Sequence, residues 1–111
     1  MPPEPGEALF EKLRNRDAVV RRQAARALGA SKLKEAVHEL VEVLADDQSA
    51  PVRRAAAEAL GKIGDPAARG PLERTLRSER DEGVRAAVTA ALARLGASTG
   101  DYPGIVPVSE E

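Results

Sequence analysis

One pattern of apolar and polar positions occurs three times along this chain. Each copy opens with Val-Arg and continues with an alanine-rich run, and the copies begin at Val20, Val52 and Val84, a constant spacing of 32 residues. Between the copies, apolar residues recur every four positions, at Ala36, Leu40 and Leu44 and again at Ala68, Leu72 and Leu76. A spacing of four places side chains on one face of a helix. Each unit therefore predicts two helices, an A helix followed by a B helix.

The constant period also predicts the architecture. Repeats of roughly 20–50 residues form solenoids, because no single unit buries its apolar face without a neighbour. Leu9 and Leu13 lie 31 residues before Leu40 and Leu44, so the opening stretch predicts a lone B helix, and no B helix follows the third A helix. We expect an all-α, right-handed α-solenoid of about six helices in antiparallel pairs. The expected repeat domain covers residues 1–97, with half repeats at 6–14 and 81–96, repeats at 17–45 and 49–77, and an extended or disordered tail at 98–111.

Capping residues mark the ends of these helices. Oxygen-bearing side chains three residues before each recurrent valine are expected to cap the A helices, namely Asp17, Ser49 and Asp81. Ser31 and Asp65 are the equivalent candidates for the B helices. Gly29 and Gly61 suit the left-handed conformation that ends a helix. Pro71 would break a helix interior, so we expect a turn over 66–70 and a regular helix only from Pro71.

The middle unit carries a recognisable motif. Its run Ala59-Leu60-Gly61-Lys62-Ile63-Gly64-Asp65-Pro66-Ala67-Ala68, preceded by Val52-Arg53-Arg54-Ala55-Ala56, resembles the short HEAT repeats of the phycobilisome-lyase type. The resemblance covers about 17–96 and implies stacked HEAT-like helix pairs with the B helices on the concave side. Most members of that family are interaction modules, and a minority attach or detach bilins.

Arginines recur on the A helices. Arg21, Arg53 and Arg85 each follow a capping position by four residues, and an Asp–Arg pair at that spacing gains about 0.2–0.5 kcal/mol. In similar HEAT repeats such residues form a ladder that ties adjacent repeats together. We expect this structural ladder at Asp17, Arg21, Arg53, Asp81 and Arg85, with a phosphate-binding row as the alternative. The further basic residues Arg22, Arg26 and Arg54 are expected on a solvated outer face, where Glu58 partly neutralises Arg54.

Composition narrows the expected partners. The chain has 17 Lys+Arg and 18 Asp+Glu, a formal net charge of −1, and 2% aromatic residues. Charges of both signs are interleaved, so we expect no strong attraction to nucleic acid or to an anionic membrane. Cysteine is absent, which excludes disulfides and thiolate metal sites. No run of about 18 apolar residues predicts a membrane span, and we expect a soluble, cytoplasmic chain.

The sequence offers few residues that could act in catalysis or bind a metal ion. His38 is the only histidine, and its possible co-ligands are carboxylates alone, at Glu39, Glu42, Asp46 and Asp47. Sites of one histidine and surface carboxylates are uncommon for transition metals. No strained turn surrounds a serine, as a hydrolytic triad would require. We therefore expect no catalytic residue, no cofactor and no metal.

Two regions are candidates for partner binding. One is the outward face of the B helices, which runs from acidic to basic along the chain and comprises Glu7, Glu11, His38, Glu39, Glu42, Glu73, Arg74 and Arg77. A simply solvated charged face accounts for it equally well. The other is the apolar, proline-containing tail with Tyr102, Ile105, Val106 and Val108. The tail either caps its own solenoid, docks on a neighbouring subunit or binds another protein.

These observations favour a noncatalytic protein–protein interaction module or adaptor whose partner is another protein. The open ends of the solenoid and the tail also allow self-association. One alternative is an accessory subunit of a tetrapyrrole (bilin) lyase, in which Arg74 or Arg77 holds propionates. A second is a nucleic-acid-binding HEAT-like protein, such as the alkylpurine glycosylases. The low aromatic content and the lack of net positive charge disfavour that second alternative.

Overall fold

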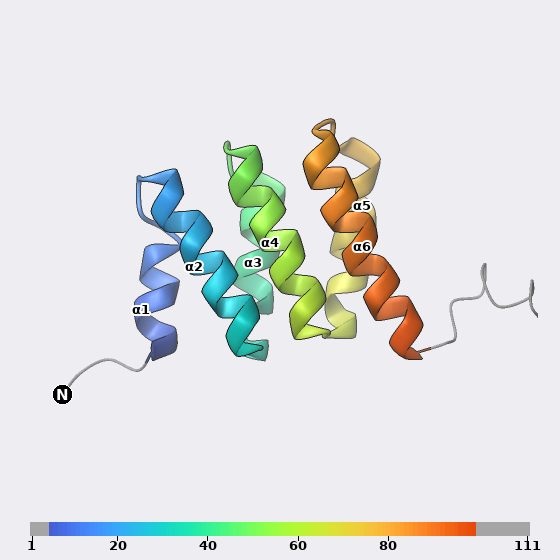
Figure 1. The fold of residues 1–111 in the computed structure, drawn as a ribbon, viewed down its shortest axis with the longest axis horizontal. Coiled ribbons are helices and arrows are strands. Elements are labelled where there is room, and N and C mark those ends of the chain that lie inside the picture. Colours follow the sequence, from blue (N-terminus) through green and yellow to red (C-terminus); the bar gives the residue numbers. More distant parts are fainter. Residues whose placement is uncertain (1–4, 100–111) are drawn as a thin grey trace, which may run out of the picture.

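The computed structural model describes residues 5–99, which form six α-helices and two short 3₁₀ helices (Figure 1). The elements are α1 (Pro5–Lys12), α2 (Ala18–Ser31), η1 (Lys34–Ala36), α3 (Val37–Asp46), α4 (Ala50–Ile63), η2 (Pro66–Ala68), α5 (Arg69–Ser78) and α6 (Glu82–Thr99). Among these helices, none has the length and apolar character that a membrane span requires.

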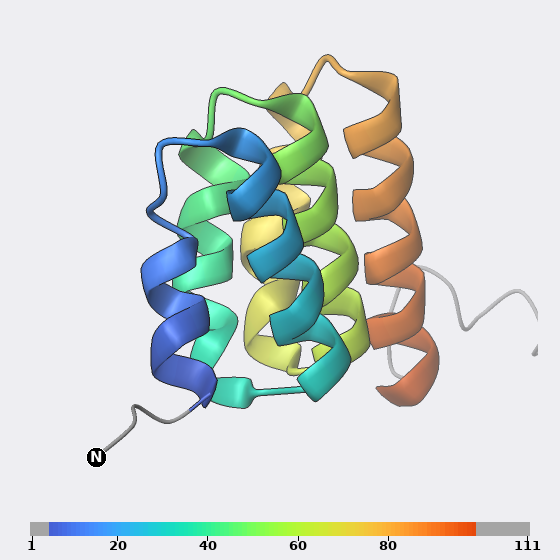
Figure 2. The same cartoon turned by 60° about the vertical axis from the view of Figure 1, so that its left-hand side comes forward.

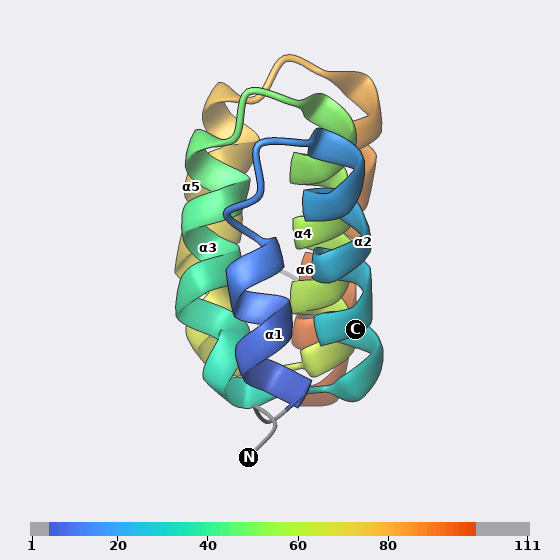
Figure 3. The ribbon, with the colours of Figure 1, turned by 90° about the vertical axis from the view of Figure 1, so that its left-hand side faces the viewer.

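The helices form two layers. Figures 1 and 3 show α2, α4 and α6 side by side in one layer, which we call the A layer, and α1, α3 and α5 in the other, the B layer. The connections lie alternately at the two ends of the layers, so successive helices run antiparallel (Figure 2). The predicted all-α solenoid of helix pairs is confirmed. The bounds of the repeat domain and of the tail stay predictions, and most of that tail lies outside the described residues.

The expected caps of the A helices are present. Asp17 Oδ1 accepts from the backbone N–H of Val19 at 2.9 Å, and Ser49 Oγ accepts from that of Val52 at 3.4 Å. Asp81 Oδ1 accepts from the backbone N–H of Val84 at 3.0 Å. Ser31 was expected to start a B helix, and that expectation is wrong. Ser31 is the last residue of α2, and the turn η1 leads into α3 instead.

Gly29 and Gly61 do not end their helices, contrary to the prediction. Both lie inside helices, and the left-handed positions belong to Lys32 (φ 55°) and Gly64 (φ 76°). The two internal glycines instead permit close contact within the A layer. A Cβ on Gly29 would lie 2.6 Å from Ala59 Cα, and one on Gly61 would lie 3.0 Å from Ala91 Cα. Their missing side chains therefore set how closely the A helices approach one another.

Replacing Gly29 with alanine is expected to destabilise the fold by about 1–3 kcal/mol, because the new methyl group would push against the backbone of α4. The gain in helix propensity, about 0.5–1 kcal/mol, is smaller and opposes this loss. Urea denaturation measures the difference. Gly70→Ala is the matched control, since a Cβ there meets only the Arg74 side chain at 3.6 Å. Equal stability changes in the two variants would show that the A helices are free to move apart.

The helix that contains Pro71 begins earlier than predicted. The helix α5 begins at Arg69, two residues before Pro71, rather than at Pro71 itself. Pro71 is thus the third residue of the helix, where the backbone N–H has no intrahelical acceptor and its absence does no harm. The preceding turn, η2, is capped by Asp65, whose Oδ1 accepts from the N–H of Ala67 at 2.9 Å.

The core lies between the two layers and consists of leucine, alanine and valine. Its largest fully buried side chains are Leu28, Leu40, Leu44, Leu60, Leu72, Leu95, Val52, Val84 and Val88. No polar or charged residue is classed as buried in the described part of the chain.

Candidate functional site

The recurrent arginines connect successive loops at one end of the layers. Arg21 donates through Nε to Asp47 Oδ2 at 2.8 Å and through Nη2 to Asp47 Oδ1 at 3.0 Å. Its Nη1 donates to the carbonyl of Asn15 at 2.8 Å. This arginine therefore joins the α1–α2 loop to the α3–α4 loop. Asp17, which shares a helix face with it, caps α2 instead.

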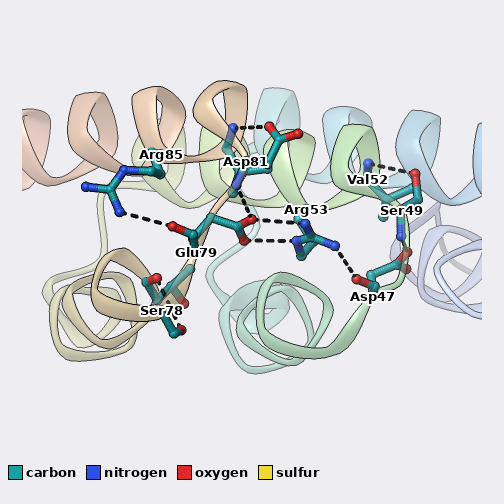
Figure 4. Close-up of polar contacts among 10 residues, drawn as sticks. Asp47, Ser49, Val52, Arg53, Ser78, Glu79, Asp81 and Arg85 are labelled. Carbon is teal, nitrogen blue, oxygen red and sulfur yellow. Dashed lines mark hydrogen bonds and ion pairs between the residues drawn. The ribbon is translucent and has the colours of Figure 1, made fainter.

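The next repeat uses the same geometry (Figure 4). Arg53 Nε and Nη2 donate to the two carboxylate oxygens of Glu79, each at 3.0 Å, and Nη1 donates to the carbonyl of Asp47 at 2.8 Å. Arg85 donates to the carbonyls of Leu76 and Glu79 at 2.8 and 3.0 Å. Sequence reasoning missed the carboxylate partners Asp47 and Glu79. The available signal was their common position, 32 residues apart and two residues before a helix cap.

Ion pairing lowers the pKa of both partner carboxylates. Burial alone would raise the pKa of Asp47, but hydrogen bonds from Arg21 and from the N–H of Ser49 outweigh it, and the pKa lies below its usual value. The pKa of Glu79 is lowered mainly by its hydrogen bonds from Arg53, against the opposing effect of burial. Both groups are therefore charged at neutral pH, and the structural role of the ladder stays a prediction.

The B-layer residues that the sequence singled out do not converge on one point. Glu7 and Glu11 are exposed on α1, Glu73 is half-buried on α5, and Arg74 and Arg77 are exposed there. On α3, His38 pairs with Glu42 at 3.1 Å, and Glu39 lies 3.6 Å from Arg14. Their role in partner binding stays a prediction.

Two further predictions concern metal binding and the C-terminal tail. Within residues 5–99, no cluster of three histidine or carboxylate side chains has a geometry suited to a metal ion. The remaining predicted site residues lie outside the described residues: Tyr102, Ile105, Val106 and Val108.

The A layer carries a groove that sequence reasoning did not identify as a site. It lies over α4, between α2 and the start of α6, and has a volume of about 460 Å³. Its charged lining residues are Arg22, Arg26, Arg54, Glu58 and Asp81. We call it the arginine groove. Arg54 Nε lies 3.2 Å from Glu58 Oε2. Arg22 is half-buried, and its Nε is shielded from solvent and has no hydrogen-bond partner.

A second, smaller hollow of about 310 Å³ lies between α4 and α6, on the same layer. Its charged residues are Lys62 and Arg94, together with the same Glu58. The two hollows thus hold five basic side chains, and Glu58 lies between them. A hollow on the B layer, between α1 and α3, is instead lined by Arg14 and four carboxylates, Glu39, Glu42, Asp46 and Asp47. The two A-layer hollows are therefore lined mainly by basic residues, whereas a hollow of about 470 Å³ between α3 and α5 mixes Arg53, Arg74 and Arg80 with Asp47 and Glu79.

Comparison with known proteins identifies the family. A family model described as HEAT repeats matches residues 6–93. The chain is a HEAT-repeat protein. The match does not distinguish the phycobilisome-lyase type from other HEAT repeats. No curated protein matched this HEAT-repeat protein.

Two solved structures similar to this HEAT-repeat protein are of epoxyqueuosine reductase. One is the selenomethionine-labelled protein, with a TM-score of 0.65, and the other is the protein with an epoxyqueuosine-modified tRNA-Tyr stem loop, with a TM-score of 0.66. In each case the sequence identity is 37%, and the similarity covers 68% of this chain but 20% of the reductase chain. This HEAT-repeat protein thus matches about a fifth of that enzyme's length, and the expected absence of catalysis stays a prediction.

Two expectations are corrected by this comparison. The predicted main function, a noncatalytic protein-interaction adaptor with another protein as its partner, is wrong, and so is the predicted absence of a nucleic-acid partner. A similar structure was solved with a tRNA stem loop, which favours the nucleic-acid-binding alternative. The net charge of −1 misled the prediction, because it averages a basic A layer with a more acidic B layer.

Proposed function

We propose that this HEAT-repeat protein binds structured RNA of the tRNA stem-loop class. The observation that carries the proposal is its 37% identity, with a TM-score of 0.66, to epoxyqueuosine reductase with a tRNA stem loop. An identity of this size over 68% of the chain supports a related role in addition to a shared fold. Because the similarity covers 20% of the reductase, we limit the function assigned to this chain to RNA binding.

The charge distribution of the A layer supports RNA binding. Arginine presents several N–H donors in a plane that matches the oxygens of a phosphate group, and phosphate contacts dominate the affinity of proteins for nucleic acids. A local cluster of positive charge attracts a polyanion even where the whole chain is nearly neutral. The arginine groove supplies such a cluster on an exposed surface.

The proposal predicts saturable, salt-dependent binding of a fluorescently labelled, unmodified tRNA stem loop by the intact chain. Three phosphate contacts would give a slope of log affinity against log salt of about −2 to −3. Raising the salt concentration fourfold should then weaken binding by about 15- to 60-fold. Fluorescence anisotropy measures both quantities.

A single-stranded RNA of the same composition is the control. Tighter binding of the stem loop than of the single strand supports recognition of folded RNA. Equal affinity for the stem loop and the single strand would show that the chain binds RNA only through general attraction between charges. Absence of saturable binding at low salt would overturn the proposal.

A further inference from the structure

The arginine groove contains cationic groups that the fold itself does not use. Within residues 5–99, neither Arg22 nor Arg26 has a side-chain hydrogen bond or ion pair, whereas Arg21 and Arg53 beside them are fully engaged in the ladder. The Nε–H of Arg22 is also shielded from solvent by the protein. Because Nε is out of reach of solvent, an anion in the groove would accept from the terminal Nη groups of Arg22 and Arg26.

We propose that the arginine groove binds a backbone phosphate of the RNA, with Arg22 and Arg26 as its donors and Arg54 as a third. This inference rests on the proposed function and assigns its binding surface. Arg22 and Arg26 are one helical turn apart on α2, so their guanidinium groups are on the same side of the groove. Arg54 occupies the position on α4 that is equivalent to Arg22 and approaches from the facing helix.

Glu58 regulates the affinity of this site. Its ion pair with Arg54 is largely solvent-exposed, with side-chain exposures of 61% for the arginine and 44% for the glutamate. Exposed pairs of this kind contribute little, so a phosphate can replace Glu58 as the partner of Arg54. The Glu58 carboxylate then remains beside the bound phosphate and repels it. The other carboxylate of the groove, Asp81, is engaged in capping α6.

The neighbouring hollow indicates that the ligand is a strand with several phosphates and not a single anion. Lys62 and Arg94 lie on the same layer, in the next space between helices. Packed helices are roughly 8–10 Å apart, so the two positive centres are about one helix spacing apart. A nucleic-acid strand places phosphates at both centres at once. Such contacts fix the position of the backbone and do not read the bases.

The test compares three variants with the intact chain, using anisotropy with the labelled tRNA stem loop. Arg22→Gln/Arg26→Gln should weaken binding at least tenfold and make the salt slope shallower by about 1, since the contact with one phosphate is lost. Glu58→Gln should tighten binding by about two- to fivefold, because a repulsive charge is lost. Lys12→Gln/Lys34→Gln removes two exposed positive charges outside the A layer and should change affinity less than twofold. Far-UV circular dichroism confirms that each variant is folded.

The outcomes separate this inference from the proposed function. If the intact chain binds the stem loop and the Arg22→Gln/Arg26→Gln variant binds equally well, the groove is not the site, although RNA binding stands. Equal losses in the two double variants would also overturn the groove assignment, because net charge alone would then explain the affinity.

If the intact chain does not bind the stem loop, the proposed function fails, and inorganic phosphate becomes the probe. A rise in the melting temperature with phosphate that the Arg22→Gln/Arg26→Gln variant lacks would retain the groove as a phosphate site. Without such a rise, the inference is overturned as well.

Discussion

Replacing Leu60 with alanine is expected to lower the free energy of unfolding by about 3–5 kcal/mol, which is the upper part of the range for buried leucines. Leu60 is 0% exposed and lies in α4, which packs against α2, α3 and α6. Neighbours on three sides hinder collapse into the cavity that the truncation leaves. Small domains are stable by only about 5–15 kcal/mol in total, so this variant should unfold at much lower urea concentration. Urea titration followed by far-UV circular dichroism measures the effect.

Val19→Ala is the control for this measurement, because Val19 is 52% exposed and its truncation should change stability by less than about 0.5 kcal/mol. The midpoint of Leu60→Ala should shift while the slope of the transition stays constant. A small shift with a shallower slope would contradict the expectation of one cooperative core. It would show that the repeats unfold separately, as in long solenoids whose units contact only their neighbours.

The fold was largely predictable from the sequence, because its signals are local and periodic. The spacing of Val20, Val52 and Val84 fixes the repeat, and side chains such as Asp17 act on backbone groups two or three residues away. The role of Gly29 was not predictable in this way. Glycine suits both a helix end and a close helix contact, and only the position of Ala59 on the neighbouring helix distinguishes them.

The candidate site was less predictable, because it depends on which residues of different repeats meet. Arg22, Arg26 and Arg54 were recognised as an exposed basic set, but their arrangement around one groove follows from the packing of α2 against α4. Net charge carries no information on that arrangement. Phosphate binding responds to local potential, so a chain of charge −1 can still present a basic surface.

The ladder and the arginine groove are connected through α4. Arg53 is held by Glu79 and by the carbonyl of Asp47, and the next residue, Arg54, lines the groove. The two arginines point to different surfaces because adjacent residues of a helix differ in direction by about 100°. The buried face of α4 fixes the rotation of the helix about its axis, and with it the directions of Arg53 and Arg54. The ladder and the proposed RNA site therefore depend on the same packed helix.

Arg53→Ala is expected to lower the free energy of unfolding by about 3 kcal/mol, because it leaves the Glu79 carboxylate without its partner. The exposures of the two side chains, 19% and 8%, make this pair largely buried. Glu79→Gln removes the charge and keeps the shape, and a smaller loss of about 1–2 kcal/mol is expected. Thermal and urea denaturation of both variants at neutral pH measure these losses.

The contribution of Glu79 to the free energy of unfolding should decrease as the pH falls. Because folding lowers the pKa of Glu79 from its usual value of 4.5, the charged carboxylate stabilises the folded state above that value. The contribution is lost as the pH falls from about 4.5 through the lowered pKa of the folded state. The stability difference between the unaltered chain and Glu79→Gln should therefore be constant above about pH 5.5 and shrink in acid. A difference that stays the same throughout the acid range would show that Glu79 acts through its shape and packing, and that its charge contributes nothing to the ladder.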